Sequence, residues 1–319
     1  MTGMSHKLKL ISEKFWAMGT NISIDVVSDG NISDKKIKEA IAAAKAVFEK
    51  YEQIFSRFRA DSELARLNKS IGKRTKVSAE MLKVLELCVS QHNASEGYFE
   101  PRIIEALENI GYDKDFRSSD FNGGSLDKPL LKKIDDKLEN NLRINPEDKT
   151  IFLKRRIDTT GIVKGYAVDR AAEDLQRYNL KNFIVDAGGD MYIEGHDSEK
   201  EEWRIAVEGV PENRLMLKLS HAGIATSGIS RKHWRRGVKK FHHLINPKDP
   251  ENFCQEFKTV TVLAEKTADA DALAKTLFLM GREKGRKFSE KNKIKVLFLD
   301  CRGNVYLSER IKENIILSS

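Results

Sequence analysis

Cysteine, proline and long apolar runs are scarce in this sequence of 319 residues. The three cysteines, Cys88, Cys254 and Cys301, are scattered and odd in number. That argues against a disulfide framework and a zinc site, and it fits a reducing compartment. No run of about 18 apolar residues occurs, so we expect no membrane span. The N-terminal stretch MTGMSHKLKLISEKFW has neither the apolar segment of a secretory signal nor a lipid-carrying cysteine, so we expect a cytoplasmic protein.

The composition is that of a soluble globular protein, with 40% hydrophobic and 33% charged residues. The formal net charge of +8 favours polyanionic partners, such as nucleic acid, an acidic protein surface or a nucleotide. Charge alone does not distinguish among these three.

Helical and strand patterns alternate irregularly along the chain, without an internal repeat. Strand-like alternation occurs within 15–28, and a helical pattern runs from about Gly161 to Tyr178. This favours a mixed α/β (α+β) fold over a doubly wound one. We expect a tail at 1–14, a single large domain at 15–319 with interleaved helices and mixed sheets, and an exposed excursion at 112–130.

The stretch IDTTGIVKGYAVD, at 157–169, combines a strand end with a helix start. A helix N-terminus offers free backbone N–H groups and a positive dipole end, which suit a phosphate. Lys164 lies in the first turn, where the dipole disfavours a cation, so an anionic ligand would explain it. The alternative is a solvated lysine. The glycine spacing matches neither a P-loop nor a dinucleotide fingerprint.

Two further stretches leave their alternatives open. In VDAGGDMY, at 185–192, the paired glycines indicate either a close backbone approach or an ordinary hairpin turn. The basic stretch at 225–247 surrounds Trp234 and could bind nucleic acid, a pyrophosphate or an acidic partner, or form a solvated hairpin. His243 falls in an alternating strand pattern there, where a lone histidine is more often structural than catalytic.

A helix is predicted over 267–281, which contains DADALAKTL. Asp271 and Lys275 are four residues apart and therefore share one face. They form either an exposed ion pair, worth roughly 0.2–0.5 kcal/mol, or part of a site.

Eight motifs occur in a telling order: MGT (Met18–Thr20), FSRFRADSELARLN (Phe55–Asn68), SEGYFEP (Ser95–Pro101), GIVKGYAVD (Gly161–Asp169), DAGGDMYIEG (Asp186–Gly195), ATSG (Ala225–Gly228), HHLINP (His242–Pro247) and ADALAKTLFLMG (Ala270–Gly281). With them the sequence resembles the FAD:protein FMN transferase family, long labelled thiamine biosynthesis lipoproteins. The resemblance implies a flavin transferase-like fold. It also implies that FAD is bound with magnesium at its pyrophosphate, that a Thr or Ser hydroxyl of a target protein attacks the FMN phosphorus, and that AMP leaves.

The resemblance also implies roles for individual residues. The implied FAD contacts are Met18, Phe58, Tyr98, Phe99, Glu100, Asp158, Lys164, Gly188, Gly189 and Ile245. The implied metal ligands are the Gly161 carbonyl and the Asp271 carboxylate. The implied catalytic residues are Asp271 and His243, the latter as proton acceptor or phosphate-orienting group.

Lys275 departs from the family pattern, because it occupies the position of a Thr that would also ligate the metal. A charged ammonium has no lone pair and cannot be a ligand. Thr276 is about 100° further around the helix and should not reach the same point.

Two functions therefore remain open. The first is an active transferase that uses FAD, Mg²⁺ and a Thr/Ser-bearing acceptor protein. The second is an FAD-binding protein with little transferase activity, in which Lys275 partly replaces the metal charge. A third possibility, nucleic-acid binding, has no support outside the basic stretch, so we expect no nucleic-acid partner.

Overall fold

The computed structural model describes residues 8–114, 134, 137–199, 201–230, 232–236, 239–253 and 256–317. From residue 115 on, the excursion expected at 112–130 lies outside these ranges, as do Cys254 and Arg231. In the described part of the chain, every helix is too short or too polar to cross a membrane.

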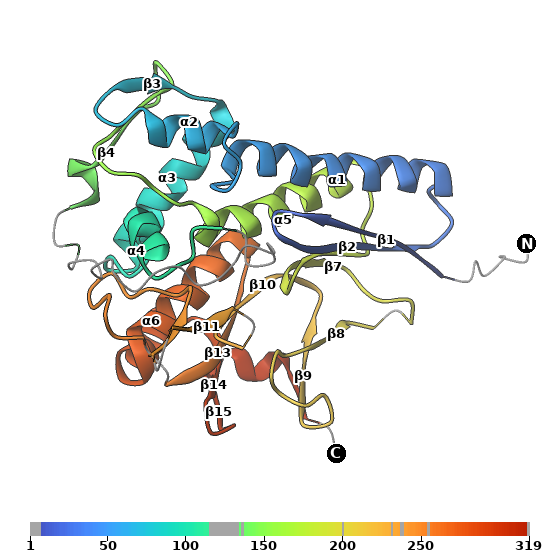
Figure 1. The fold of residues 1–319 in the computed structure, drawn as a ribbon. Helices are drawn as coiled ribbons and strands as arrows, with labels where there is room; N and C mark the ends of the chain where they lie inside the picture. The colour runs from blue at the N-terminus through green and yellow to red at the C-terminus, as the bar shows by residue number, and fades with distance from the viewer. Residues whose placement is uncertain are drawn as a thin grey trace, which may run out of the picture.

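Helices and strands are interleaved, as expected (Figure 1). The α-helices are α1 (Asp34–Phe55), α2 (Glu63–Lys69), α3 (Ala79–Ala94), α4 (Ile104–Asn109), α5 (Thr160–Arg177) and α6 (Thr267–Lys291). The 3-10 helices are η1 (Pro101–Ile103), η2 (Leu138–Asn140) and η3 (Glu309–Asn314).

An antiparallel sheet forms the centre of the fold, with strand order β1-β2-β6-β7-β10-β13-β14-β15. Its strands are β1 (Lys9–Ala17), β2 (Thr20–Ser28), β6 (Phe183–Ala187), β7 (Asp190–Glu194), β10 (His221–Gly228), β13 (Phe257–Ala264), β14 (Lys295–Asp300) and β15 (Val305–Leu307). The smaller sheets comprise β3 (Arg74–Lys76), β4 (Leu142–Asn145) and β5 (Thr150–Leu153); β8 (Trp203–Ala206), β9 (Leu215–Leu219) and β16 (Ile315–Leu317); and β11 (His233–Arg236) with β12 (Lys239–His242).

The N-terminal boundary differs from the expectation. Residues 9–14, expected in a tail, belong to β1, which pairs with β2 from Lys9 opposite Ser28. The segment expected as one strand is two strands joined by a turn at Met18 and Gly19. β1 is an edge strand with most side chains exposed, so burial imposes no apolar alternation on it.

Helices α1, α5 and α6 pack beside the sheet, and α5 contacts both α1 and α6 (Figure 1). α1 begins where the Ser33 hydroxyl accepts a hydrogen bond from the Lys36 N–H. α6 packs on β10 and β13, and its apolar stripe joins their buried face. A separate apolar cluster links β8, β9 and η3 to the sheet.

Close contact between α5 and α6 fixes the relative position of these two helices. A Cβ on Gly165 of α5 would lie 2.6 Å from the Thr267 carbonyl oxygen at the start of α6. The buried Asp169 carboxylate of α5 accepts hydrogen bonds from the backbone N–H groups of Thr267 and Ala268, at 2.7 and 3.0 Å. This carboxylate caps a helix whose own N-cap, Lys266, has no capping side chain. The side chains in the first turns of α6 therefore have a fixed position relative to α5.

Candidate functional site

A cavity of about 680 Å³, which we call the central cavity, collects segments that are distant in sequence. It is bordered by the β1–β2 turn, the end of α1, the segment 98–107, the start of α5, the β6–β7 turn, the end of β10, the segment 243–245 and α6. Its volume is typical of a pocket for a cofactor-sized ligand.

Nearly all of the residues singled out in the sequence line this cavity. They are Met18, Phe58, Tyr98, Phe99, Glu100, Asp158, Gly161, Lys164, Gly188, His243, Ile245, Asp271 and Lys275. Gly189 is the exception. It occupies the second position of the β6–β7 turn and does not line the cavity.

The two glycines of VDAGGDMY form a hairpin turn, and one of them also allows a close approach. Gly188 and Gly189 have φ values of +66° and +102°, as a two-residue hairpin turn between twisted strands requires. A Cβ on Gly188 would collide with the hydroxyl of Thr20, which follows the β1–β2 turn. Both interpretations of this motif therefore hold, and the two hairpin turns meet at the cavity wall.

A buried ion pair holds the start of α5. The Asp158 carboxylate accepts a hydrogen bond from the Thr160 N–H at 2.7 Å and lies 3.2 Å from Arg57 Nε. The guanidinium of Arg57 also stacks over the rings of Phe58 and Tyr112, at 4.2 and 4.5 Å from their centroids. Asp158 thus organises the helix N-terminus and the aromatic wall beside it.

Glu100 is likewise engaged within the protein. Its carboxylate accepts two hydrogen bonds from the Arg102 guanidinium, at 2.7 and 2.8 Å, and lies 3.5 Å from His92 Nδ1. The neighbouring Tyr98 ring has the ammonium groups of Lys248 and Lys284 each 4.8 Å from its centroid. This segment presents aromatic rings to the cavity on a rigid, charge-paired support.

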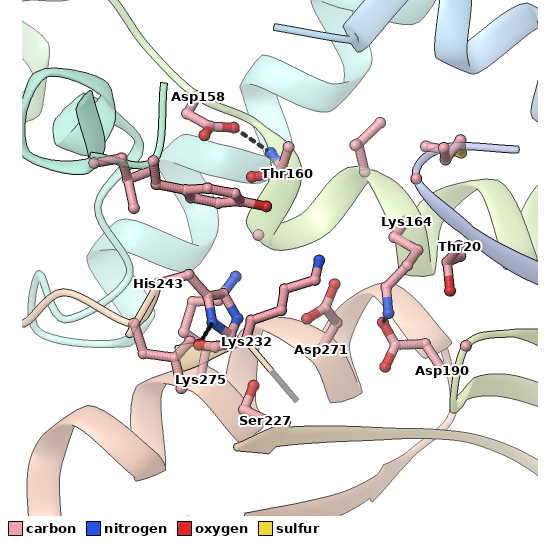
Figure 2. A pocket seen from close by; sticks show the side chains of 18 of the residues that line it. Thr20, Asp158, Thr160, Lys164, Asp190, Ser227, Lys232, His243, Asp271 and Lys275 are labelled. Carbon is pink, nitrogen blue, oxygen red and sulfur yellow. Dashed lines mark hydrogen bonds and ion pairs between the residues drawn. The ribbon is translucent and has the colours of Figure 1, made fainter. Parts of the chain in front are cut away.

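Lys164 is paired rather than solvated. Its ammonium lies 2.6 Å from the buried Asp190 carboxylate and donates a hydrogen bond to the Ala187 carbonyl at 3.2 Å (Figure 2). Burial acts to lower the pKa of Lys164, but the carboxylates of Asp190 and Asp271 outweigh it, so the pKa is raised. Lys164 therefore stays charged at neutral pH.

Asp271 lies buried in the cavity wall. Burial, and then the nearby Asp190 carboxylate, raise its pKa to about 7, although Lys275 and Lys164 act to lower it. Its Oδ2 atom is buried and forms no hydrogen bond within the described part of the chain. A buried carboxylate oxygen without a partner is costly, and it is typical of a group that meets a ligand or a cation.

Lys275 projects from the same face of α6 as Asp271, as the four-residue spacing predicts (Figure 2). A Cβ on Gly161 would collide with its Nζ atom, so the ammonium packs directly against the glycine at the start of α5. The same ammonium lies 6.0 Å from the centroid of the Phe99 ring. Thr276 is buried and does not line the cavity, again as predicted.

His243 borders the cavity one residue after β12 ends, rather than within the strand that the sequence pattern suggested. Burial, and then the positive charges of Lys232 and Lys275, hold its pKa well below the usual range. Its Nδ1 faces the Lys232 carbonyl oxygen at 3.4 Å. A carbonyl can only accept, so the proton sits on Nδ1 and the lone pair on Nε2.

The residues implied as metal ligands do not fit a divalent ion as they stand. The orphaned Asp271 oxygen suits a cation, but the Lys275 ammonium packs against Gly161, the other implied ligand. The described residues contain no cluster of three His, Cys, Asp or Glu side chains that could hold a metal. The implied donor set is therefore one carboxylate and one backbone carbonyl, and it lies beside a cation.

Three further residues of the cavity were not singled out as site residues in the sequence. Arg57, Asp190 and Lys232 all line it. Arg57 and Asp190 lie within motifs of the resemblance, and Lys232 lies within the basic stretch. Their role depends on partners far away in sequence, which spacing alone does not reveal.

Comparison with known families identifies the fold. The sequence model of the ApbE family matches residues 18–298. This chain belongs to the ApbE family. Among ApbE-family relatives, the FAD:protein FMN transferase of Haemophilus influenzae is 28% identical over 316 residues, covering 94% of this chain and 89% of the relative. That of Vibrio cholerae is 26% identical over 296 residues, covering 88% and 85%.

Solved structures of ApbE proteins have the same fold. The flavinyl transferase ApbE of Pseudomonas stutzeri, in its apo form, gives a TM-score of 0.81 at 20% identity, covering 97% of this chain and 98% of that one. The flavin transferase ApbE of Vibrio cholerae gives 0.78 at 25% identity, covering 96% and 99%. The expected mixed α/β, flavin transferase-like domain is thereby confirmed.

Proposed function

We propose that this protein is an FAD:protein FMN transferase, which moves FMN from FAD to a Thr or Ser hydroxyl of an acceptor protein and releases AMP. The observation that carries the proposal is the convergence of the family motifs on one cavity. That cavity combines aromatic side chains with cations next to a helix N-terminus. A ligand with a flavin ring and a diphosphate fits this combination, because the ring suits the aromatic side chains and the diphosphate suits the cations.

The flavin would lie against the aromatic residues, and the diphosphate near the start of α5. Phe58, Tyr98 and Phe99 offer ring faces for stacking, and Met18 and Ile245 add apolar contact. Lys164 and the positive dipole end of α5 at Gly161 would attract the phosphates. Asp158 and Glu100 would act mainly by holding Arg57 and Arg102, since their carboxylates are already engaged with these side chains.

The reaction is a phosphoryl-type transfer. The acceptor hydroxyl oxygen forms a bond to the FMN phosphorus while the bond from that phosphorus to the bridging oxygen breaks. AMP leaves with the bridging oxygen, and the hydroxyl proton goes to a base. Positioning and charge stabilisation supply most of the rate enhancement in such reactions.

His243 is the proposed proton acceptor. Its neutral state and its Nε2 lone pair suit a base, and hydrogen bonding of Nδ1 to the Lys232 carbonyl would orient the ring. Asp271, with its pKa raised to about 7, lies near Lys164 and Lys275 and would offset part of their positive charge.

Mg²⁺ at the diphosphate, through Gly161 and Asp271, is what the resemblance implies. When bound, such an ion neutralises charge on the transferred phosphoryl group. Because the Lys275 ammonium packs against Gly161, this residue set does not fit the ion.

The test is to incubate the purified protein with FAD and an acceptor domain from an ApbE-family system, with and without Mg²⁺. A matched acceptor carrying Thr→Ala at its modified position is the control. We expect covalent in-gel flavin fluorescence on the intact acceptor only, with release of an equal amount of AMP. Flavin that stays noncovalent under all conditions would contradict the proposal.

A further inference from the structure

We propose that the Lys275 ammonium is a built-in cation for the diphosphate of FAD and replaces the divalent ion that the family pattern would place there. FAD binding by this chain is then independent of metal. The inference rests on the proposed function for the identity of the ligand, and it concerns how that ligand is held.

The position of Lys275 on α6 is the first support. Asp271 and Lys275 are one turn apart and both line the central cavity, whereas the adjacent Thr276 is buried outside it. α6 is held against α5 by Asp169 and by the close contact at Gly165. The backbone of Lys275 is therefore held in a position from which its side chain extends into the cavity.

The place of the ammonium is the second support. Nζ packs against Gly161 at the N-terminal end of α5, where no side chain intervenes. Backbone N–H groups at a helix start attract phosphate oxygens. An ammonium at the same point adds three hydrogen-bond donors to this anion site.

The availability of its charge is the third support. Lys164, Arg57 and Arg59 also line the cavity, and each has a carboxylate within ion-pair distance. Within the part of the chain that the structure describes, Lys275 has no carboxylate at that distance. It is attracted to Asp271 through space but is not closed off by it. Its donors are therefore open to a ligand.

The same placement disfavours a metal ion. A divalent cation between the Asp271 carboxylate and the Gly161 carbonyl would lie beside the positively charged ammonium of Lys275. Like charges at contact distance in a partly buried site are strongly unfavourable. One cation at this point excludes the other, so Lys275 and a metal are alternative solutions to the same charge problem.

The experiment measures FAD affinity by flavin fluorescence quenching, in EDTA and in excess Mg²⁺. The variants are Lys275→Thr, Lys275→Arg, and Lys287→Thr as a matched control on the exposed face of α6. We expect the parent, Lys275→Arg and Lys287→Thr to bind FAD equally well in both buffers. We expect Lys275→Thr to lose about tenfold or more in EDTA, as for a lost charge-assisted hydrogen bond, and to regain affinity with Mg²⁺.

A direct metal readout accompanies the titration. Mn²⁺ is added to each FAD complex, and bound ion is followed by electron paramagnetic resonance. We expect the Lys275→Thr complex to bind Mn²⁺ and the parent complex not to bind it. An unchanged circular dichroism spectrum and melting temperature show that the variant is folded.

Two results would overturn the inference: a parent that needs Mg²⁺ to bind FAD or that binds Mn²⁺ as Lys275→Thr does, or a Lys275→Thr variant with unchanged affinity in EDTA. Failure of the proposed function looks different. In that case the parent holds FAD without metal through Lys275, yet no acceptor becomes flavinylated in either buffer.

Discussion

At the scale of single residues, three ionisable side chains of the central cavity have charge states set by their surroundings. Lys164 keeps its charge through Asp190, and burial with nearby cations keeps His243 neutral. Burial raises the pKa of Asp271 to about 7. Perturbed groups that gather in one cavity are typical of a functional site, because each shift reflects an arrangement that folding alone does not need.

The pH dependence of transfer separates the two candidate catalytic groups. If His243 accepts the proton, kcat/KM depends on its neutral form, and activity falls only when pH drops through its lowered pKa. We therefore expect a level profile from pH 8 to below about 6.5, the unperturbed value for histidine. AMP release measured across pH checks this, and an acid limb centred near pH 7 would assign the titration to Asp271 instead. His243→Ala should lower the rate about 10²–10⁴-fold.

The Lys164–Asp190 pair predicts a stability effect that can be separated from ligand binding. Lys164→Met leaves Asp190 buried without its partner, and we expect a loss of about 3 kcal/mol in the free energy of unfolding. The double variant Lys164→Met/Asp190→Asn should regain most of this stability but still bind FAD about tenfold more weakly. Urea unfolding and fluorescence titration measure the two quantities. Normal FAD affinity in the double variant would mean that Lys164 serves structure alone.

At the scale of elements, the contact between α5 and α6 joins the two sides of the site. α5 carries Gly161 and Lys164, and α6 carries Asp271 and Lys275. Asp169 and the close approach at Gly165 set the separation of the helices. The position of each cationic group therefore depends on the packing between these two helices.

Gly165→Ala tests this dependence by the sign of its effect. In an unconstrained helix, Gly→Ala stabilises by about 1 kcal/mol. Here the added Cβ would meet the backbone of α6 at 2.6 Å, so we expect a net destabilisation of about 1–3 kcal/mol from overpacking, with weaker FAD binding. Thermal unfolding of the folded variant is the measurement. A raised melting temperature would show that the helices are free to separate.

The sequence predicted some elements well, for reasons visible in the structure. The helix predicted from about Gly161 to Tyr178 is α5 (Thr160–Arg177), because its apolar side chains recur at helical spacing and are buried. β10 was missed: its sequence, HAGIATSG, is rich in small residues. A Cβ on Gly223 would collide with the backbone at the start of α6, so helix contact rather than hydrophobic pattern selects these residues.

For the site, the sequence predicted which residues take part better than it predicted which side chains pair. The resemblance named residues that meet in one cavity, and helix spacing alone predicted the shared face of Asp271 and Lys275. Neither the resemblance nor helix spacing predicted that Lys164 pairs with Asp190 or that Arg57 pairs with Asp158. Such pairs depend on tertiary distances between segments, which neither periodicity nor motif spacing contains.

At the scale of the whole molecule, the central cavity is assembled from both ends of the described chain. The β1–β2 turn and the end of α1 come from the N-terminal part, and α6 comes from the C-terminal part (Figure 1). Aromatic side chains and phosphate-binding groups thus share one cavity of about 680 Å³. A ligand must extend across both sets to use the whole site.

This assembly predicts a preference for FAD over free FMN. FAD carries a flavin ring and a diphosphate joined to a nucleoside, so it can contact more of the cavity wall than FMN does. We expect FAD to bind at least about tenfold more tightly, equivalent to about 1.4 kcal/mol. Parallel titrations by flavin fluorescence quenching measure the ratio. Equal or tighter binding of FMN would argue against a site extended along both sets of contacts.

Intact-protein mass spectrometry of an acceptor domain, after incubation with this protein and FAD, measures the transfer directly. We expect the acceptor to gain the mass of one phosphoester-linked FMN at a Thr or Ser. We also expect an equal amount of AMP, and no gain in mass when FMN replaces FAD as donor. An acceptor of unchanged mass, in the presence of bound FAD and with Mg²⁺ either present or absent, would show that this protein is not the proposed transferase.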